Sequence, residues 1–276
     1  MNTKFDLTIE PGKGFGGYWK ELWQYRELFY FMAWRDILVR YKQTVIGIIW
    51  SVLRPLLTMV VFTLVFGKLA KMPSEGEAPY PVMVFAALLP WQLFSTVLTE
   101  STNSMVANAN MISKIYFPRL IIPSSSAIVS LTDFLISFGM LLLIMFWYQF
   151  LPGWQILFLP IFLFIALIAA LGAGLWLGAL NVKYRDFRYI VPFMVQLGLY
   201  ISPVGFSSSV IPDKYRLLYS LNPMVGVIDG FRWAILGESS ALYWPGLLLS
   251  IVVTLCMITC GVTYFRSMER TFADII

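Results

Sequence analysis

The stretch ILFLPIFLFIALIAALGAGLWLGAL, residues 156–180, contains no charged side chain. A membrane-spanning helix needs about 20 consecutive, mostly apolar residues, and this stretch is longer than that. Because a bilayer supplies no water to the backbone, a single segment that crosses it must pair its own peptide groups, as an α-helix does. We therefore predict that residues 156–180 form a transmembrane helix, and that the rest of the fold is built around such helices.

The composition of the whole chain agrees with a membrane protein. Of its 276 residues, 59% are hydrophobic and 13% are charged, and the mean hydropathy is +0.75. Soluble domains have about 45–50% apolar and about 25% charged residues. This composition excludes an ordinary soluble enzyme, a nucleic-acid-binding domain and a disordered protein. The net charge of +5 is therefore better explained by cytoplasmic loops and anionic lipid headgroups than by nucleic acid.

Five further apolar stretches are also predicted to span the membrane. The expected fold class is an all-α membrane protein with six transmembrane helices, at about residues 45–66, 81–103, 121–148, 156–180, 189–206 and 245–265. A seventh apolar stretch, residues 217–236, is interrupted by Asn222-Pro223 and carries Asp229 and Arg232. Six spans with a cytoplasmic N-terminus place most Lys and Arg residues on the inner side, as the positive-inside rule requires. We therefore expect both termini in the cytoplasm and residues 217–236 as a re-entrant helical pair on the outer side.

The segment before the first span differs from the rest. Residues 1–17 form a polar leader with scattered charges, which does not resemble a cleavable signal peptide. In residues 18–44, Leu22, Tyr25 and Phe29 recur at helical spacing, and several tryptophans accompany them. This pattern predicts an amphipathic helix that lies in the cytoplasmic membrane interface, with a helix packed on a partner protein as the alternative. Residues 45–276 then form the transmembrane domain.

The sequence carries no recognisable catalytic or metal site. It contains no histidine, which is the commonest general base and metal ligand. Cys256 and Cys260 are four residues apart in an apolar run and do not form a CxxC motif. No G-x-x-x-x-G-K-[ST] motif is present, so this chain has no P-loop with which to bind ATP. We expect no cofactor in this chain and no enzymatic activity of its own.

Two groups of residues within the spans have a predicted role. Ala170, Gly174 and Gly178 share one helix face and are expected to let another helix approach closely. Ionisable residues in a membrane suggest function by default. Asp229 and Arg232 are expected to pair with each other. Arg54 should reach the inner surface, and Glu100 and Asp133 are expected to be hydrated or bound to backbone near helix ends.

Five motifs occur in a characteristic order along the chain. The first covers residues 34–56 and contains WRDI (34–37), RYKQT (40–44), Gly47, Trp50 and Pro55-Leu56. The other four are ISKIYFPR (112–119), LNVKYRD (180–186), ISPV (201–204) and LNPM (221–224). Together they resemble the ABC-2 family of permeases that export polysaccharides such as O-antigen, capsule or teichoic acid precursors. The resemblance covers nearly the whole chain after about residue 20.

This resemblance implies a half-transporter in the cytoplasmic (inner) membrane. Two copies of the chain would form the channel, and two copies of a separate ATP-binding cassette subunit, which binds ATP and Mg²⁺, would drive it. The implied cargo is a lipid-linked polysaccharide, with O-antigen of lipopolysaccharide favoured. Two inner loops would dock on the ATPase. Their coupling residues would be Asn108, Lys114, Tyr116, Phe117, Arg119, Tyr184, Arg185 and Asp186.

Two hypotheses concern the cargo. Arg35, Arg40 and Lys42 form a cationic group at headgroup depth and are expected to attract the pyrophosphate of the lipid carrier. Aromatic rings stack on the apolar faces of sugars, so we expect the sugar path to be lined by four aromatic residues. They are Trp50, Trp91, Phe94 and Tyr200.

Three other classes of function remain as alternatives. The nearest is an ABC-2 permease for drugs or lipids. A membrane-embedded glycosyltransferase or acyltransferase is disfavoured because the chain lacks histidine and a paired acid cluster. A gradient-driven carrier is disfavoured because no inverted repeat is evident.

Overall fold

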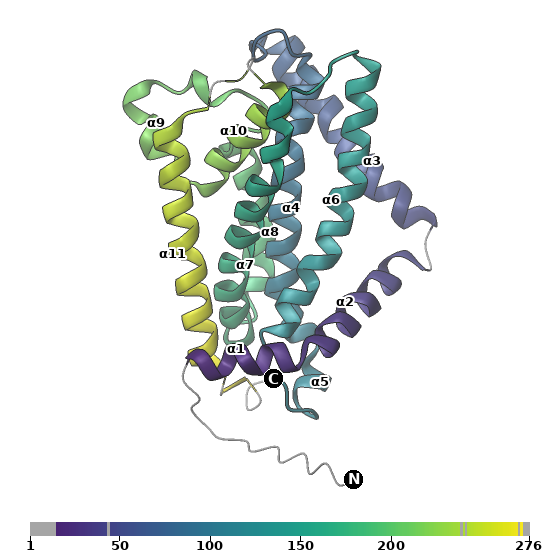
Figure 1. Cartoon of the computed structure of the whole chain (residues 1–276), viewed down its shortest axis with the longest axis vertical. Coiled ribbons are helices and arrows are strands. Elements are labelled where there is room, and N and C mark those ends of the chain that lie inside the picture. The colour runs from purple at the N-terminus through teal and green to yellow at the C-terminus, as the bar shows by residue number, and fades with distance from the viewer. Residues whose placement is uncertain (1–14, 43–44, 238–239, 241, 270, 273–276) are drawn as a thin grey trace.

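A computed structural model describes residues 15–42, 45–237, 240, 242–269 and 271–272. The described chain is helical throughout, with turns between helices and no strand (Figure 1). Five segments are long and apolar enough to cross a membrane: Ile49–Leu69, Tyr80–Ala107, Ile121–Trp147, Trp154–Lys183 and Trp244–Met268. They coincide with five of the six predicted spans. The prediction of an all-α membrane protein is therefore confirmed.

The elements follow one another in a simple order. Two short helices, α1 (Phe15–Gln24) and α2 (Arg26–Tyr41), precede α3 (Val45–Phe62), which continues as the π-helix η1 (Thr63–Leu69). The next part of the chain comprises α4 (Tyr80–Ala107), α5 (Ala109–Ile112), α6 (Ile121–Trp147), the 3₁₀ turn η2 (Trp154–Phe158) and α7 (Leu159–Lys183). The last part comprises α8 (Phe187–Ile201), η3 (Ser208–Val210), α9 (Asp213–Tyr219), α10 (Pro223–Leu236) and α11 (Trp244–Met268).

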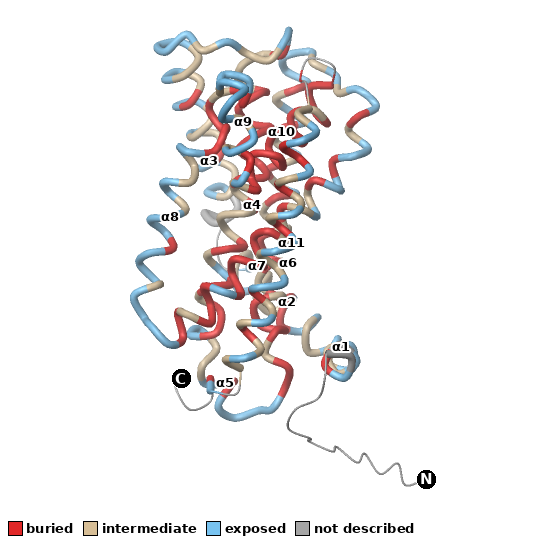
Figure 2. Tube along the Cα trace, turned by 90° about the vertical axis from the view of Figure 1, so that its left-hand side faces the viewer, coloured by how far each residue is buried: buried red, intermediate tan, exposed pale blue. Residues whose placement is uncertain are grey.

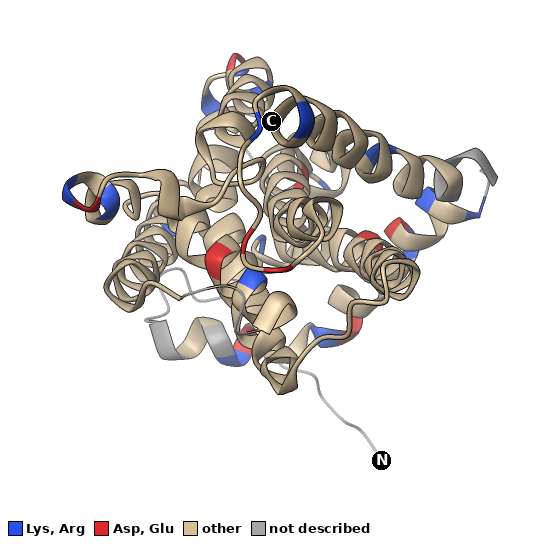
Figure 3. Ribbon diagram, turned by 90° about the horizontal axis from the view of Figure 1, so that it is seen from above, with Lys and Arg blue, Asp and Glu red and all other residues tan. Residues whose placement is uncertain are grey.

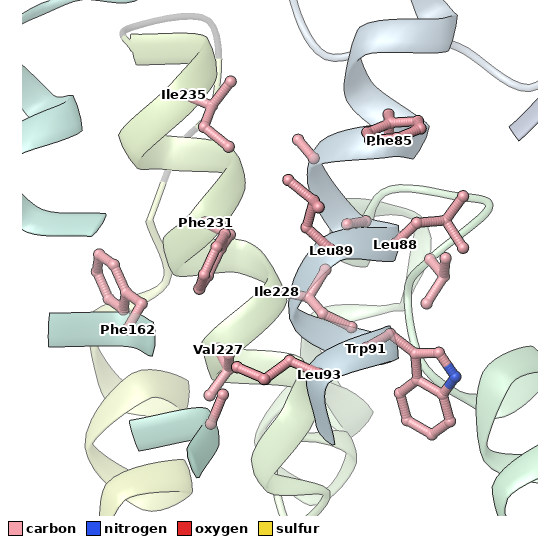
Figure 4. Packing of buried hydrophobic residues seen from close by; sticks show 14 of the residues in the cluster. Phe85, Leu88, Leu89, Trp91, Leu93, Phe162, Val227, Ile228, Phe231 and Ile235 are labelled. Carbon is pink, nitrogen blue, oxygen red and sulfur yellow. The ribbon is translucent and has the colours of Figure 1, made fainter. Parts of the chain in front are cut away.

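Helix α4 forms the centre of the bundle. Of its most apolar window, 78% of the residues are buried, and it packs against α7, α6 and α10. Figure 4 shows Phe231 of α10 pointing toward Phe162 of α7, whereas Trp91 points to the opposite side of α4. Figure 2 shows the same division, with buried residues concentrated along the inner helices.

Small residues bring α7 close to two neighbours. A Cβ atom added at Gly174 would lie 2.7 Å from the Ser101 Cβ atom, and one at Gly178 would lie 3.3 Å from the Ser101 carbonyl oxygen, both on α4. The predicted role of these glycines in helix packing is thereby confirmed. On the other side of α7, a Cβ atom at Gly261 of α11 would lie 2.2 Å from the carbonyl oxygen of Gly172.

The predicted fifth span is shorter in the structure than in the sequence analysis. Helix α8 ends at Ile201 after 15 residues, which is too few for an untilted span. Pro203 explains this end, because proline has no backbone N–H and disfavours a helical conformation in the residue before it. The chain continues as a buried, irregular segment through residues 202–205.

Residues 217–236 contain the end of α9 and all of α10, with a break between the two helices. Helix α9 ends at Tyr219, and α10 begins at Pro223. The Asn222 side chain accepts a hydrogen bond from the Met224 N–H at 3.0 Å, and Pro223 occupies the first helical position, where its missing N–H costs nothing. The broken helical character of this segment agrees with the Asn-Pro pair in the sequence.

The N-terminal segment forms two helices rather than one. Helix α1 begins at Phe15, and the chain bends at Tyr25 before α2. Met32 and Ala33 are buried, whereas Trp23 and Trp34 are exposed. Figure 1 shows α1 crossing the end of the bundle where α5 and the end of α11 lie, with α9 and α10 near the opposite end. Most of the leader and residues 43–44 lie outside the described residues.

Candidate functional site

A cavity of about 760 Å³ lies among α3, α4, α6 and α8, with the end of α2 at its border. Three of the four aromatic residues predicted for the sugar path line it, namely Trp50, Trp91 and Tyr200. Helices that lie far apart in the sequence thus place these rings around one space. Phe94 is not among the lining residues; it packs behind Trp91, with the two ring centroids 5.6 Å apart.

The ring of Trp91 is held in place by a glycine. A Cβ atom added at Gly198 of α8 would lie 2.5 Å from the Trp91 ring, so the indole occupies space that only a glycine leaves free. Tyr200 stands two residues further along α8, with its ring centroid 6.2 Å from that of Phe62. Trp91 is therefore buried at 5% exposure, whereas Trp50 and Tyr200 are both 57% exposed.

Uncharged polar side chains complete the wall. Gln92 on α4 and Gln196 on α8 line the cavity, and each amide can both donate and accept hydrogen bonds. Ser95 and Thr96 also line it and donate to the Gln92 carbonyl oxygen at 2.9 and 2.8 Å. Because these donors are already used within α4, their hydroxyl oxygens remain available as acceptors. The wall thus combines apolar ring faces with hydrogen-bonding groups.

Arg40 forms ion pairs with both acidic residues that line the cavity. Its guanidinium lies 2.7 Å from Asp133 and 3.6 Å from Glu100, and the Tyr41 hydroxyl also donates to Asp133. The expectation that Asp133 is hydrated near a helix end is wrong. Asp133 lies in the middle of α6, where the end of α2 packs against it. Arg54 lines the same cavity from α3.

The three cations predicted to bind pyrophosphate do not share one site. Arg35 pairs with Asp36 at 2.7 Å and donates to the Asn108 side chain at 3.3 Å, at the end of α4. Neither Arg35 nor the exposed Lys42 lines the cavity. Only Arg40 does, beside Arg54. The cavity wall thus contains two guanidinium groups from different elements, and the sequence analysis had not placed Arg54 with Arg40.

The predicted coupling residues divide into two groups. Lys114, Tyr116, Tyr184, Arg185 and Asp186 are exposed. Phe117, in contrast, is buried. Arg119 is turned inward toward the end of α11, and Asn108 bonds to the Ser104 carbonyl oxygen and to Arg35. Five of the eight predicted residues are thus exposed, whereas Phe117 is buried and Asn108 and Arg119 are half-buried.

Glu269 connects three elements at this end of the bundle. Its carboxylate accepts hydrogen bonds from the Arg119 backbone N–H at 3.0 Å and from the Tyr18 hydroxyl of α1 at 3.3 Å. The Arg119 guanidinium also donates to the Glu269 carbonyl oxygen. Burial raises the pKa of the Glu269 carboxyl above its ordinary value, and burial likewise raises the pKa of Tyr18. No sequence pattern indicated this contact, because its members are up to 251 positions apart.

The expected pairing of Asp229 with Arg232 is wrong. Arg232 is fully buried and pairs with Glu75 at 3.2 Å, and it donates to the carbonyl oxygens of Phe206 and Val204 at 2.9 and 3.1 Å. Asp229 accepts instead from the Ser208 hydroxyl at 2.7 Å. The Arg232 guanidinium thus contacts both the loop before α4, through Glu75, and the irregular segment after α8, through the two carbonyl oxygens. Figure 3 shows how sparse such charges are among the helices.

The fold and the cavity together define a polytopic α-helical membrane protein with a polar, aromatic-lined space between its helices. Comparison with known families gives the class more closely. Residues 27–236 match the family described as ABC-2 type transporter. The match covers most of the chain, so this protein belongs to the ABC-2 type transporter family, as the motifs in its sequence had indicated.

Individual relatives are named for polysaccharide export. The chain is 28% identical to the O-antigen export system permease protein RfbA of Myxococcus xanthus, over 93% of this chain and 98% of that protein. It is 29% identical to a protein of the same name from Klebsiella pneumoniae, over 88% and 92%. It is also 22% identical to the polysialic acid transport protein KpsM of Escherichia coli, over 86% and 91%. The chain is thus similar along most of its length to permeases.

Proposed function

We propose that this chain is the membrane subunit of an ATP-driven exporter of a lipid-linked polysaccharide, with O-antigen as the cargo. The observation that carries the proposal is the cavity among α3, α4, α6 and α8. Its rings and amides suit a chain of sugars, because stacking tolerates sliding and hydroxyl groups find hydrogen-bond partners at many positions. The names of the relatives support the same cargo.

The lipid carrier's pyrophosphate would meet Arg40 and Arg54 at the border of the cavity. A guanidinium matches phosphate oxygens with two parallel hydrogen bonds. Asp133 and Glu100 hold Arg40 in the absence of cargo. An incoming dianion would compete with these carboxylates for the guanidinium, so binding and release can both occur without leaving Arg40 unpaired.

The membrane topology belongs to the same proposal. Helix α8 and the buried segment after it would form the fifth of six spans, and α9 with α10 the re-entrant pair on the outer side. Both termini would then lie in the cytoplasm, with α1 and α2 in the inner interface of the cytoplasmic membrane. The exposed aromatic residues Trp23 and Trp34 support an interfacial position, because tryptophan favours headgroup depth.

A second copy and an ATPase would complete the exporter. Only 11% of the apolar window of α3 is buried by the chain itself, and Val191 is the sole buried residue of α8. These helices line the cavity and leave faces uncovered, which supports a homodimer with both cavities at its centre. The exposed residues of the α4–α6 and α7–α8 connections would bind two ATP-binding subunits, which supply ATP and Mg²⁺ sites.

The test uses export in cells that carry the complete system. The double substitution Trp91→Ala and Tyr200→Ala removes two rings of the cavity and should lower polysaccharide export at least tenfold. Trp147→Ala, at an 83% exposed position at the far end of α6, is the matched control and should export normally. Unchanged export by the double variant, at normal abundance, would contradict the proposed path.

The class of cargo is tested with the purified complex. An ATPase subunit should copurify in one-to-one stoichiometry, and lipid-linked polysaccharide should stimulate its ATP hydrolysis. Stimulation by drugs or free lipids alone would favour the alternative permease class. Sugar or acyl transfer by the purified chain without an ATPase would favour the enzyme class.

A further inference from the structure

A second cavity lies on the outside of the bundle, away from the candidate transport path. It has a volume of about 690 Å³ and is formed by α1 and α2 together with the start of α6 and parts of α7 and α11. None of its lining residues lines the cavity among α3, α4, α6 and α8, which we call the transport cavity because of its proposed role. We call it the α1–α11 groove.

The groove exists because the bent N-terminal helices bridge two parts of the bundle. At one end, Tyr18 of α1 bonds to Glu269 beyond α11. At the other end, Met32 and Ala33 of α2 are buried, and α2 packs on α6. Between these attachments the chain bends at Tyr25 and passes over the groove. Figure 1 shows α1 crossing in front of α7 and α11 at this point.

The floor of the groove is apolar, and it is closed because α7 and α11 are in direct backbone contact. Gly172 and Gly261 draw α7 and α11 into backbone contact, and Leu175 and Ile258 of these helices line the floor. Thr259 and Thr263 also line the groove, but their hydroxyl groups donate to carbonyl oxygens of α11 itself, at 2.8 and 2.7 Å. Because these donors are satisfied internally, the threonines can present methyl groups to an occupant at no cost in hydrogen bonds.

One charged side chain stands at the border of this apolar space. Among the described residues that line the groove, Arg26 is the single ionisable one. Its guanidinium lies 5.8 Å from the centroid of the Trp23 ring, and Trp23 is 70% exposed. A tryptophan beside an arginine at the edge of an apolar groove is the arrangement expected where acyl chains meet phosphate groups.

We propose that the α1–α11 groove binds one phospholipid with a net negative headgroup. An acyl chain occupies the groove between α7 and α11, and the phosphate lies against Arg26. The lipid fills the space between the bundle and the bend that joins α1 and α2, and it contacts both. This inference uses the proposed position of α1 and α2 at the membrane surface, but it does not depend on what the transport cavity carries.

The first arm of the test fills the groove. The full-length chain is purified in mild detergent with equimolar phosphatidylglycerol and phosphatidylcholine, and native mass spectrometry counts the lipids that it retains. Val262→Trp places an indole inside the groove, and Thr263→Trp is a second filler should the first variant fold poorly. The matched control is Val252→Trp, on the same helix but outside the groove. The fillers should lose one phosphatidylglycerol that the wild type and the control retain.

The second arm tests the charge. Arg26→Gln should reduce the preference for phosphatidylglycerol over phosphatidylcholine about fivefold, which is the effect of one arginine near an anionic surface. Lys20→Gln removes an exposed cation of α1 that does not line the groove, and it should leave the preference unchanged. Inorganic phosphate added at equal concentration should not displace the lipid, because it has no acyl chain.

Three results would overturn the proposal. The first is equal lipid retention by the groove-filling variants and Val252→Trp; if the dimer population of the fillers also fell, the groove would be assigned to a second copy of the chain. The second is an equal preference for phosphatidylglycerol in Arg26→Gln and Lys20→Gln. The third is displacement of the lipid by free phosphate. None of these results would affect the export experiment, whose double variant changes Trp91 and Tyr200 in the other cavity.

Discussion

At the scale of single residues, the structure depends on positions that accept only one type of residue. Gly261 and Arg232 are the clearest examples. The first allows two helix backbones to touch, and the second satisfies two carbonyl oxygens and a carboxylate inside the protein. Both are buried, and the cost of changing either follows from what surrounds it.

Gly261→Ala should destabilise the protein. The added Cβ atom would lie 2.2 Å from the Gly172 carbonyl oxygen, so α7 and α11 must separate, at a cost of about 1–3 kcal/mol. Gly139→Ala on α6 is the control, since no described atom outside its own helix turn lies within 4 Å of the added Cβ. It should be neutral or stabilise the helix by up to about 1 kcal/mol. Thermal unfolding of both variants in one detergent measures the difference, and equal midpoints would contradict the close contact.

Arg232 and Glu75 should behave as a coupled pair. Arg232→Met leaves Glu75, which is 10% exposed at its side chain, without its partner, and loss of one member of a buried pair costs about 3–5 kcal/mol. The double variant Arg232→Met and Glu75→Gln should recover part of that loss, because no unpaired charge remains. Denaturation of the single and double variants gives the coupling energy. Strictly additive effects would show that the pair does not interact.

At the scale of elements, the sequence predicted those helices and helix breaks that depend on hydropathy or on a local proline or glycine. Five spans, the glycine face of α7 and the break at Asn222-Pro223 all follow from residues close together in the chain. The length of α8 was missed because hydropathy continues past Ile201, whereas Pro203 ends the helix. The bend at Tyr25 was also missed, because the apolar pattern runs through it.

The contact at Glu269 gives a prediction about these elements. Through Tyr18 and Arg119, Glu269 links the connection between α5 and α6 to α1 and to the end of α11. If the exposed residues of that connection contact the ATPase, as we propose, their movement would be passed to both helices. Glu269→Ala leaves the Arg119 N–H and the Tyr18 hydroxyl without this acceptor. In the assembled exporter we expect ATP hydrolysis to continue while export falls severalfold.

The control for this experiment is Glu77→Ala, an exposed acidic residue in the loop before α4. It should leave both activities unchanged. Parallel losses of hydrolysis and export in Glu269→Ala would indicate a failure of assembly, whereas normal export would show that the contact does not transmit movement. Both results would contradict the prediction.

At the scale of the whole molecule, the candidate site could be predicted only in part. The sequence identified three aromatic residues of the cavity because they stand in or beside spans. It could not place Phe94 behind Trp91, or Arg35 at the end of α4, because these positions depend on how helices rotate against one another. The partners of Arg40 and Arg232 were missed for the same reason, since they come from other helices.

The uncovered faces of α3 and α8 give the last prediction. Leu57 on α3 is 51% exposed and Phe193 on α8 is 61% exposed, and both helices border the cavity. In a two-fold dimer the same faces meet, with each contact occurring twice. The variant for this test carries Leu57→Cys and Phe193→Cys, with Cys256 and Cys260 replaced by serine. On oxidation in membranes, it should therefore give cross-linked dimers.

The control tests a helix outside this contact. Val252→Cys on α11, which Figure 1 shows on the opposite flank from α3, should give no cross-linked dimer under the same oxidant. Cross-linking through Val252→Cys, with none through the other pair, would place the dimer contact at α11, so that the two transport cavities would lie apart instead of joining at its centre.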